Sequence, residues 1–198
     1  MIKVKTIKKG IKVGTDIPFQ QSYGNVGRWA EEQLANNGYV MSNGKGVDIP
    51  GLGVECKTRK VESNSPHTVG TMTIADIINT KYEDSVIFEK FQQQYRVSYS
   101  DEGQIVLSEN VFDFSDPDIQ QHIREAYECG RAEIAAETAN YGFPPRYVRG
   151  GDFGQFEITE SNNSYRFRIP NGAMKKIETI SIGASVFNSL FETIDTEA

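Results

Sequence analysis

The chain contains few of the residues that staple or anchor small proteins. Only two of its 198 residues are cysteines, Cys56 and Cys129, and neither has a second metal-ligating residue at the usual spacing. A disulfide framework and a cysteine-based zinc site are therefore not expected. No apolar run approaches the roughly 20 residues that span a bilayer, and the N-terminus lacks an apolar segment of the signal-peptide type. These absences predict a soluble intracellular protein, in the cytoplasm or, for a phage-encoded gene, in the host cytoplasm.

Two groups of catalytic motifs are also missing. The glycines around Lys45, in "GKG", are too few for a phosphate-binding P-loop, and no strand is followed by a GxxxxGK[ST] sequence. No serine or cysteine has a histidine and an acid in a context that predicts a nucleophilic triad. NTP hydrolysis and covalent catalysis by serine or cysteine are therefore not expected.

Charge is divided unevenly along the sequence. Residues 1–60 hold 10 Lys and Arg against 5 Asp and Glu, a net charge of +5, whereas residues 61–198 hold 11 against 22, a net charge of −11. A basic first third can attract a polyanion such as DNA. A solvated lysine-rich surface explains the same lysines, and this alternative stays open. The acidic remainder suggests that DNA is gripped mostly from one side.

Apolar periodicity predicts an α/β or α+β fold with a mixed central sheet flanked by helices. The expected helices cover residues 24–38, 73–79, 85–94, 115–139 and 184–194. The expected strands cover residues 39–41, 47–49, 52–58, 155–159 and 165–169, with further strands between 95 and 114 and a strand or arm within 1–14. The polar, serine-rich residues 60–72 are expected to form a loop. The domain expectation is a core of residues 1–140, with a C-terminal hairpin and helix at 141–198 packed on it.

The stretch "GKGVDIPGLGVECKTRK", residues 44–60, places three charged side chains where a sheet normally buries apolar ones. On a strand, Glu55 and Lys57 project from one face and Cys56 from the other. Asp48 precedes a tight turn, and a hairpin or bent ribbon would bring its carboxylate beside that of Glu55. Two converging carboxylates resist joint ionisation, and a hard divalent cation removes that conflict.

These residues suit a magnesium site. Mg²⁺ prefers oxygen ligands, uses one or two carboxylates, and completes its shell with water and substrate phosphate. Asp48 and Glu55 would bind the metal, and the backbone carbonyl of Cys56 would supply a further oxygen. Lys57 would orient or deprotonate the nucleophile, or stabilise charge in the transition state. The chemistry that uses all these groups is phosphodiester hydrolysis, with Mg²⁺ as cofactor and Mn²⁺ as its substitute.

The run "VDIPGLGVECK" resembles the motif of the PD-(D/E)XK nuclease superfamily, in which an acid on one strand precedes a Glu-x-Lys on the next. On this resemblance, Asp48 takes the first position, Glu55 the second and Lys57 the third. The resemblance extends over residues 24–60, because "GRWAEEQLANNGYVM" looks like the helix that precedes the motif in Holliday-junction resolvases and some restriction enzymes. That helix carries a glutamate in these families.

Two adjacent glutamates compete for the family position on this helix. The Gly-x-x-Ala-Glu run selects Glu31, as a ligand of a second metal or as part of the water network, with Glu32 as the second candidate. Adjacent residues lie about 100° apart around a helix axis, so both cannot face the same site. Glu31 lies beside Leu34 and is expected along the edge of the buried face, whereas Glu32 is expected to point toward solvent.

The resemblance implies a restriction-endonuclease-like fold and a Mg²⁺-dependent DNA endonuclease of restriction, junction-resolving, or replication and repair type. Enzymes of this superfamily commonly act as dimers, so the resemblance also implies a homodimer. One alternative is a non-catalytic DNA-binding or assembly module that retains the nuclease fold, and another is a metal-dependent phosphatase. The simplest alternative is a surface hairpin, which explains Glu55 and Lys57 but not Asp48.

Cations outside the motif supply candidate DNA contacts. Arg59 and Lys60 extend the motif strand, and Arg59 shares the face of the motif lysine. Arg146 and Arg149 lie in "FPPRYVRGGDFG", a mixture typical of loops that enter a groove or stack on bases. A solvated strand end and an ordinary linker explain these segments as well. His67 is a further candidate for phosphate contact or proton transfer, with a plain exposed histidine as the alternative.

Overall fold

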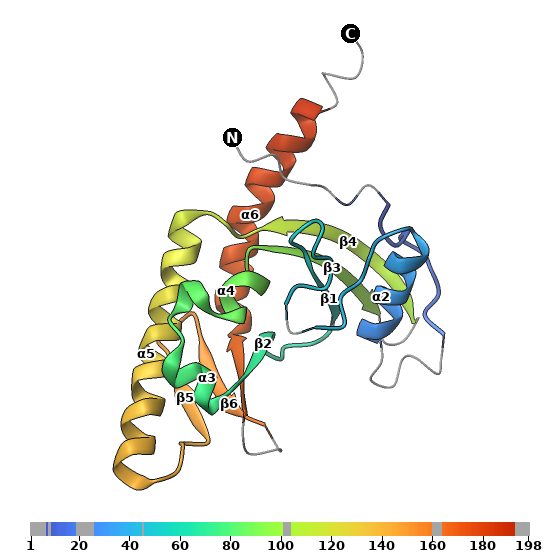
Figure 1. Cartoon of the computed structure of the whole chain (residues 1–198). Helices are drawn as coiled ribbons and strands as arrows, with labels where there is room; N and C mark the ends of the chain where they lie inside the picture. Colours follow the sequence, from blue (N-terminus) through green and yellow to red (C-terminus); the bar gives the residue numbers. More distant parts are fainter. Residues whose placement is uncertain are drawn as a thin grey trace. The chain divides into compact units, whose positions relative to one another are not determined.

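The computed structural model describes residues 7, 9–18, 26–44, 46–100, 104–159 and 164–192, with side chains as far as Ser181. The described residues form five α-helices, one 3-10 helix and seven strands in two sheets (Figure 1). The expected mixture of α and β structure is confirmed, with two sheets where one central sheet was expected. The chain forms two compact units, of which unit 1 contains residues 1–63, 92–113 and 185–198 and unit 2 contains residues 64–91 and 114–184. The expected core of residues 1–140, with the hairpin and helix of residues 141–198 packed on it, stays a prediction.

Unit 1 is built on a three-stranded mixed sheet in the order β1-β3-β4. The strands are β1 (Glu55–Lys60), β3 (Gln93–Ser100) and β4 (Ile105–Asp113). β1 runs parallel to β3, and β4 runs antiparallel to β3. β1 is an edge strand of this sheet, so one side of its backbone is turned away from β3. The helix expected at residues 85–94 is shorter, because Gln93 and Gln94 belong to β3 and pair with β4 and β1, non-local interactions that local propensity does not report.

Helix α2 (Val26–Asn36) packs on one face of this sheet. Its residues Val26, Trp29, Ala30 and Leu34 are buried, which is the stripe expected of an amphipathic helix. Gly38 follows at φ +96°, a left-handed conformation that glycine adopts without strain, and the helix ends where the sequence predicted. One apolar core joins α2 to the sheet and comprises Ile11, Ile17, Val26, Trp29, Ala30, Leu34, Ile49, Val54, Cys56, Tyr95, Val97, Tyr99 and Val106.

The segment between α2 and β1 carries Asp48 and is more compact than the expected pair of strands. Ile49 and Val54 form a single antiparallel bridge, in which the Ile49 N–H donates to the Val54 carbonyl at 2.9 Å. Residues 39–41, expected as a strand, form none. A tight turn of four residues therefore delivers the chain from Asp48 directly into β1.

Unit 2 contains a four-stranded antiparallel sheet in the order β2-β7-β6-β5. The strands are β2 (His67–Thr73), β5 (Tyr147–Arg149), β6 (Gln155–Ile158) and β7 (Ser164–Ile169). The expected C-terminal hairpin is β6–β7, and it belongs to this larger sheet. The prediction of a loop at residues 60–72 is wrong from His67 onward, where the chain forms β2. Thr68 of β2 pairs with Arg168 of β7, a partner so distant in sequence that local polarity does not reveal it.

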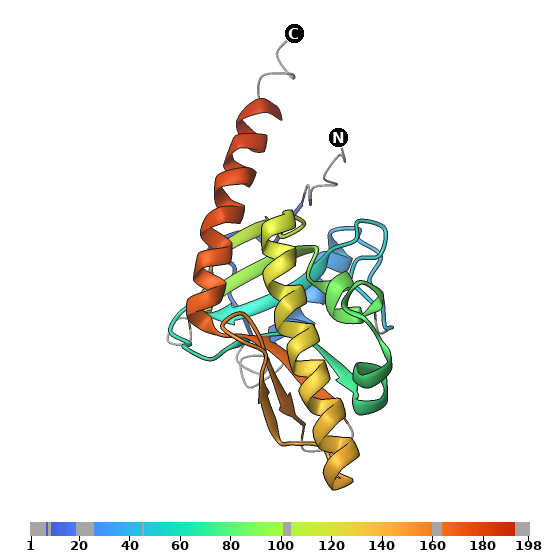
Figure 2. The same ribbon diagram turned by 90° about the vertical axis from the view of Figure 1, so that its left-hand side faces the viewer.

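The long helix α5 (Pro117–Tyr141) begins with the cap that its sequence predicts and continues beyond the expected end at residue 139. The Asp116 carboxylate accepts hydrogen bonds from the N–H groups of Asp118 and Ile119, and Pro117 occupies the first turn. In unit 2, α5, drawn in yellow, lies over the strands of the sheet (Figure 2). A Cβ at Gly130 would lie 2.5 Å from the Phe156 ring, so the close approach of helix and β6 requires glycine there.

Helix α6 (Asn171–Glu192) begins well before the expected start at residue 184. Its first turns bury Ala173, Met174 and Ile177, an i, i+1, i+4 pattern that the sequence analysis did not use. Among the helices described, none has both the length and the apolar composition required to cross a membrane.

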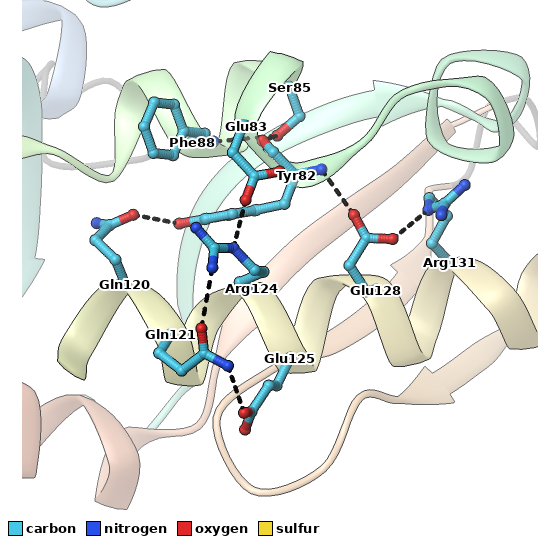
Figure 3. A network of polar contacts seen from close by, with 10 residues as sticks. All are labelled: Tyr82, Glu83, Ser85, Phe88, Gln120, Gln121, Arg124, Glu125, Glu128 and Arg131. Carbon is cyan, nitrogen blue, oxygen red and sulfur yellow. Dashed lines mark hydrogen bonds and ion pairs between the residues drawn. The ribbon is translucent and has the colours of Figure 1, made fainter. Parts of the chain in front are cut away.

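A polar network fastens the short helices of unit 2 to α5 (Figure 3). The short helices are α3 (Ile74–Asn79), the 3-10 helix η1 (Tyr82–Asp84) and α4 (Val86–Lys90). The Tyr82 hydroxyl donates to Gln120 Oε1 at 2.9 Å, and the Tyr82 N–H donates to the Glu128 carboxylate at 2.8 Å. Arg131 donates to the other oxygen of Glu128 at 2.7 Å. Gln120 and Glu128 of α5 therefore hold Tyr82, and with it η1, in place.

Candidate active site

Asp48 is held at the open edge of β1 by two hydrogen bonds, one to its side chain and one to its backbone carbonyl. Its carboxylate oxygen Oδ2 accepts from the Cys56 N–H at 2.8 Å, and its backbone carbonyl accepts from the Ser42 N–H at 2.8 Å. The bridge between Ile49 and Val54 closes the turn that connects Asp48 to β1. The Asp48 carboxylate therefore contacts the backbone of the motif strand next to Glu55, and its expected position beside the Glu55 carboxylate stays a prediction.

Glu55 and Lys57 lie on one face of β1, as two residues two positions apart on a strand must. The Glu55 side chain is only 1% exposed, and Lys57 Nζ lies 2.5 Å from Glu55 Oε1 while its own side chain stays 29% exposed. Cys56 points to the opposite face, into the apolar core beneath α2. The expected same-face pair is confirmed, with a buried acid and a partly exposed lysine.

The Cys56 backbone is turned toward Asp48. In an extended strand, the N–H and C=O of one residue point to the same side of the strand. The Cys56 N–H bonds to the Asp48 carboxylate and not to β3, so the Cys56 carbonyl is also directed toward the open edge of β1. An oxygen from the backbone and an oxygen from Asp48 therefore lie on the same side of this strand.

The two helix glutamates are oriented as predicted. Glu31 is partly buried, whereas Glu32 is exposed and accepts a hydrogen bond from Arg28 Nε at 3.1 Å on the solvent side. α2 lies directly over β1, because a Cβ on Gly27 would sit 3.8 Å from Thr58 Oγ1. Glu31 is thus the more buried of the two glutamates, and its place in the site stays a prediction.

The electrostatic environment of Cys56 shows which charges lie around this point. Burial raises the pKa of the Cys56 thiol well above its usual range, and the carboxylates of Asp48, Glu31 and Glu55 raise it further. The Lys57 ammonium lowers that pKa and does not outweigh the other effects. The thiol is therefore protonated and is not a nucleophile. The charges of all four predicted site residues are therefore felt at this thiol, although Glu55 and Lys57 project from the face of β1 opposite Cys56 and α2.

The donor set fits magnesium. Within the described part of the chain, no three His, Cys, Asp or Glu side chains come together as a complete metal cage. Mg²⁺ does not need such a cage, because it takes one or two carboxylates and fills its octahedron with water and substrate oxygens. Asp48, Glu55 and the Cys56 carbonyl offer oxygen atoms only, which is the chemistry of a hard cation and not of zinc or copper.

Two residues near this site were missed by the sequence analysis. Gln94 and Arg96 lie on β3 in register with Glu55 and Lys57, respectively, and are only 1% and 7% exposed. Neighbours across a sheet share a face, so all four side chains lie on the side opposite α2. The signal was present in "QYRVSY", in which Gln94 and Arg96 alternate with apolar residues. Local periodicity predicts the end of a helix at Gln94 followed by an ordinary strand, which gives these two side chains no special role.

The predicted DNA contacts fall on both units. Arg59 and Lys60 end β1 in unit 1, and Arg59 Nη2 donates to the Ser63 carbonyl at 2.9 Å. Arg146 and Arg149 are exposed in unit 2, where Arg149 Nη2 lies 3.1 Å from Asp152 Oδ1. His67 is the first residue of β2 and does not lie in a loop. Their contact with DNA stays a prediction.

Comparison with known proteins identifies no family for this chain. The sequence matches no protein-family model, and a search of curated proteins found no match. The resemblance of residues 24–60 to the PD-(D/E)XK motif is therefore supported by the motif and by the local geometry alone.

Proposed function

We propose that the protein is a Mg²⁺-dependent DNA endonuclease with a restriction-endonuclease-like fold. The observation that carries this proposal is the buried ion pair of Glu55 and Lys57 on a strand whose edge is lined by the Asp48 carboxylate. Glu31 lies on the overlying helix α2, and its charge, like that of Asp48, raises the pKa of the Cys56 thiol on the same strand. This is the arrangement that phosphodiester hydrolysis requires: acids for a metal, and a cation beside the reacting phosphate.

Stability alone does not explain why these charges are buried. Removing a carboxylate and an ammonium from water costs several kcal/mol per ion, by order of magnitude, and a pair of apolar residues often serves the fold better. Glu55 is almost fully buried, and the Asp48 carboxylate accepts a hydrogen bond from a backbone N–H at the edge of the same strand. Groups that are costly for folding and clustered together are the expected mark of a reactive site.

Each residue has a distinct role in the proposed reaction. Asp48, Glu55 and the Cys56 carbonyl would hold Mg²⁺, which when bound polarises the phosphate and lowers the pKa of its water. Lys57 positions the attacking water and stabilises charge on the phosphate. Glu31 orders the water network or contributes to a second metal site. Arg59 and Lys60, on the same strand, would contact the DNA backbone.

The second candidate function is a non-catalytic DNA-binding or assembly module with the same fold. Such a module has no use for Glu55 in a buried position, and loss of that acid would be tolerated. The retained Asp48, Glu55 and Lys57 therefore favour the enzyme. Action as a homodimer is part of the proposal, because cutting two strands benefits from two sites.

The decisive experiment is a cleavage assay with the purified protein. Supercoiled plasmid, linear duplex and a four-way junction are incubated with the protein in Mg²⁺ or in EDTA. We expect cleavage of at least one of these substrates in Mg²⁺ only, and the substrate that is cut separates a general endonuclease from a junction resolvase. Binding to DNA without cleavage of any substrate, in either Mg²⁺ or Mn²⁺, would favour the non-catalytic module.

A further inference from the structure

The buried pair formed by Gln94 and Arg96 has no role in the proposed reaction so far. Arg96 donates two hydrogen bonds to a single atom, Gln94 Oε1, from Nε at 3.0 Å and from Nη2 at 2.7 Å. The Arg96 guanidinium carbon also lies 5.1 Å from the centre of the Phe112 ring on β4, a cation–π contact. A buried arginine held on two sides in this way has one orientation.

The two bonds to Gln94 Oε1 also orient the glutamine. An amide side chain accepts through its oxygen and donates through its nitrogen, on opposite sides of the same carbon. Because the oxygen faces Arg96, the Nε2 donor is turned away from the guanidinium. The in-register neighbour of Gln94 on β1 is Glu55, a residue whose ionised carboxylate can only accept hydrogen bonds.

The charges on this face are arranged as a chain across two strands. Glu55 is the buried acid, Lys57 is its ion-pair partner, and Arg96 is the in-register neighbour of Lys57. Lysine is a flexible cation that can turn from one acceptor to another, whereas arginine keeps its charge at all relevant pH values and its geometry is fixed. The chain therefore contains one mobile cation and one permanent cation.

We propose that Arg96 and Gln94 are positioning residues of the site. Arg96 fixes the Gln94 amide with its donor toward Glu55, and its charge balances the Glu55 carboxylate when Lys57 turns toward the reacting phosphate. Glu55 then keeps the orientation needed to bind metal without depending on Lys57. This inference rests on the proposed function, because it assigns Glu55 to a metal and Lys57 to the substrate.

The test compares two substitutions with a control on the same strand face. Gln94→Glu keeps the size of the side chain and its acceptor toward Arg96 but replaces the donor with an acceptor. Arg96→Met removes the charge and keeps most of the length. Ser98→Ala is the control, because Ser98 is the next same-face residue of β3 and pairs in register with Arg59. Arg96→Lys, which keeps the charge but not the fork, is the conservative variant.

Three quantities are measured for each variant: Mn²⁺ affinity by calorimetry, kcat and KM for DNA cleavage, and unfolding by urea without metal. We expect Gln94→Glu and Arg96→Met to weaken Mn²⁺ binding and lower kcat by about tenfold to 100-fold each. KM for DNA should stay within about threefold of the wild type, because no DNA contact is removed. Arg96→Lys should recover part of the Mn²⁺ affinity, and Ser98→Ala should change nothing.

A spectroscopic measurement tests the contact itself, without activity. The side-chain amide resonance of Gln94, identified by its loss in Gln94→Met, should shift in Glu55→Gln and stay in place in Ser98→Ala. Variants that are less stable but retain wild-type Mn²⁺ affinity and kcat would overturn the inference and leave a purely structural pair. If the wild type binds Mn²⁺ and cuts no DNA, the nuclease proposal fails. The Mn²⁺ affinities and the Gln94 resonance still decide whether Gln94 and Arg96 position Glu55.

Discussion

The Asp48 carboxylate and the Cys56 N–H are joined by a hydrogen bond of 2.8 Å across the turn that leads into β1. The backbone of the motif strand thereby fixes the position of the first acid of the motif. Its partner is a main-chain group, which no substitution of a neighbouring side chain removes. The acid and the strand that carries Glu55 and Lys57 consequently form one rigid piece.

Asp48→Asn tests the role of the charge at this position. Asparagine keeps the shape and still accepts the bond from Cys56, so the fold should be unaffected. We expect cleavage to fall by about 100-fold or more, the scale on which loss of one charge-stabilising group acts. DNA affinity should stay equal or increase, because a carboxylate that repels phosphate has been removed. Single-turnover cleavage and fluorescence anisotropy measure the two effects separately. A variant that binds DNA poorly yet cuts bound DNA at the normal rate would assign Asp48 to DNA binding or to structure.

Metal exchange tests the oxygen donor set. Cleavage should require Mg²⁺ or Mn²⁺ and should be weak with Ca²⁺, which binds oxygen ligands but favours a larger and looser coordination shell. Initial rates in the three metals and in EDTA decide this, and Ca²⁺ should compete with Mg²⁺. Undiminished cutting in EDTA would exclude the metal mechanism.

The features of the site that were predictable from sequence are those set by local geometry. Strand alternation places Glu55 and Lys57 on one face, a tight turn returns Asp48, and helix periodicity turns Glu31 inward and Glu32 outward. Each needs only the residues within one turn or one element. Local rules also predicted the N-terminal end of α5, where Asp116 caps the helix and Pro117 occupies the first turn.

The features that were missed depend on pairing between distant segments. β2 is polar and serine-flanked, and it is a strand because β7 pairs with it much later in the chain. Gln94 and Arg96 matter because β1 runs parallel to β3 in a register that aligns them with the motif. Parallel pairing joins strands through a long connection, so no local pattern fixes the register. The sequence therefore predicts the chemistry of the motif residues but not the side chains that β3 places beside them.

Gln120→Leu tests the polar network of unit 2. Gln120 Nε2 donates to the carbonyls of Phe91 and Phe114, at 3.1 and 2.8 Å, and its oxygen accepts from Tyr82. Leucine adds apolar surface at a buried position but leaves these three groups unsatisfied, so we expect a loss of about 3 kcal/mol in the free energy of unfolding. Gln121→Leu, on the exposed side of the same helix, should cost less than about 0.5 kcal/mol. Urea denaturation of the two variants measures both free energies of unfolding. Equal losses in the two variants would mean that the buried network does not stabilise unit 2.

Glu31→Gln and Glu32→Gln test which helix glutamate belongs to the site. Glu31 is partly buried and acts electrostatically on the motif strand, whereas Glu32 pairs with Arg28 in solvent. We expect Glu31→Gln to lower cleavage by at least about tenfold, as loss of a group that supports a metal site does. Glu32→Gln should leave cleavage unchanged, because an exposed ion pair contributes little. Turnover at saturating Mg²⁺ is the measurement, and the reverse order of effects would transfer the role to Glu32.

The ion pair of Glu55 and Lys57 permits a test that separates function from stability. Lys57→Met alone removes the cation at 2.5 Å from a carboxylate that is 1% exposed, so it should destabilise the metal-free protein by about 3 kcal/mol. The double variant Glu55→Leu/Lys57→Met replaces both charges with apolar side chains of similar size. We expect its stability to return to within about 1 kcal/mol of the wild type or to exceed it.

Cleavage should be lost in both the single and the double variant, because neither retains the cation, and the double variant also lacks the acid. Mg²⁺ should raise the melting temperature of the wild type, since a ligand that binds only the folded state stabilises it, and should leave that of the double variant unchanged. Urea denaturation in EDTA, thermal melts with and without Mg²⁺, and plasmid cleavage give the three readings. A double variant that is stable and still cuts DNA at the wild-type rate would show that the pair serves neither metal binding nor catalysis. A stable, inactive double variant that no longer responds to Mg²⁺ would mean that this strand keeps a buried carboxylate and its lysine partner for chemistry and not for folding.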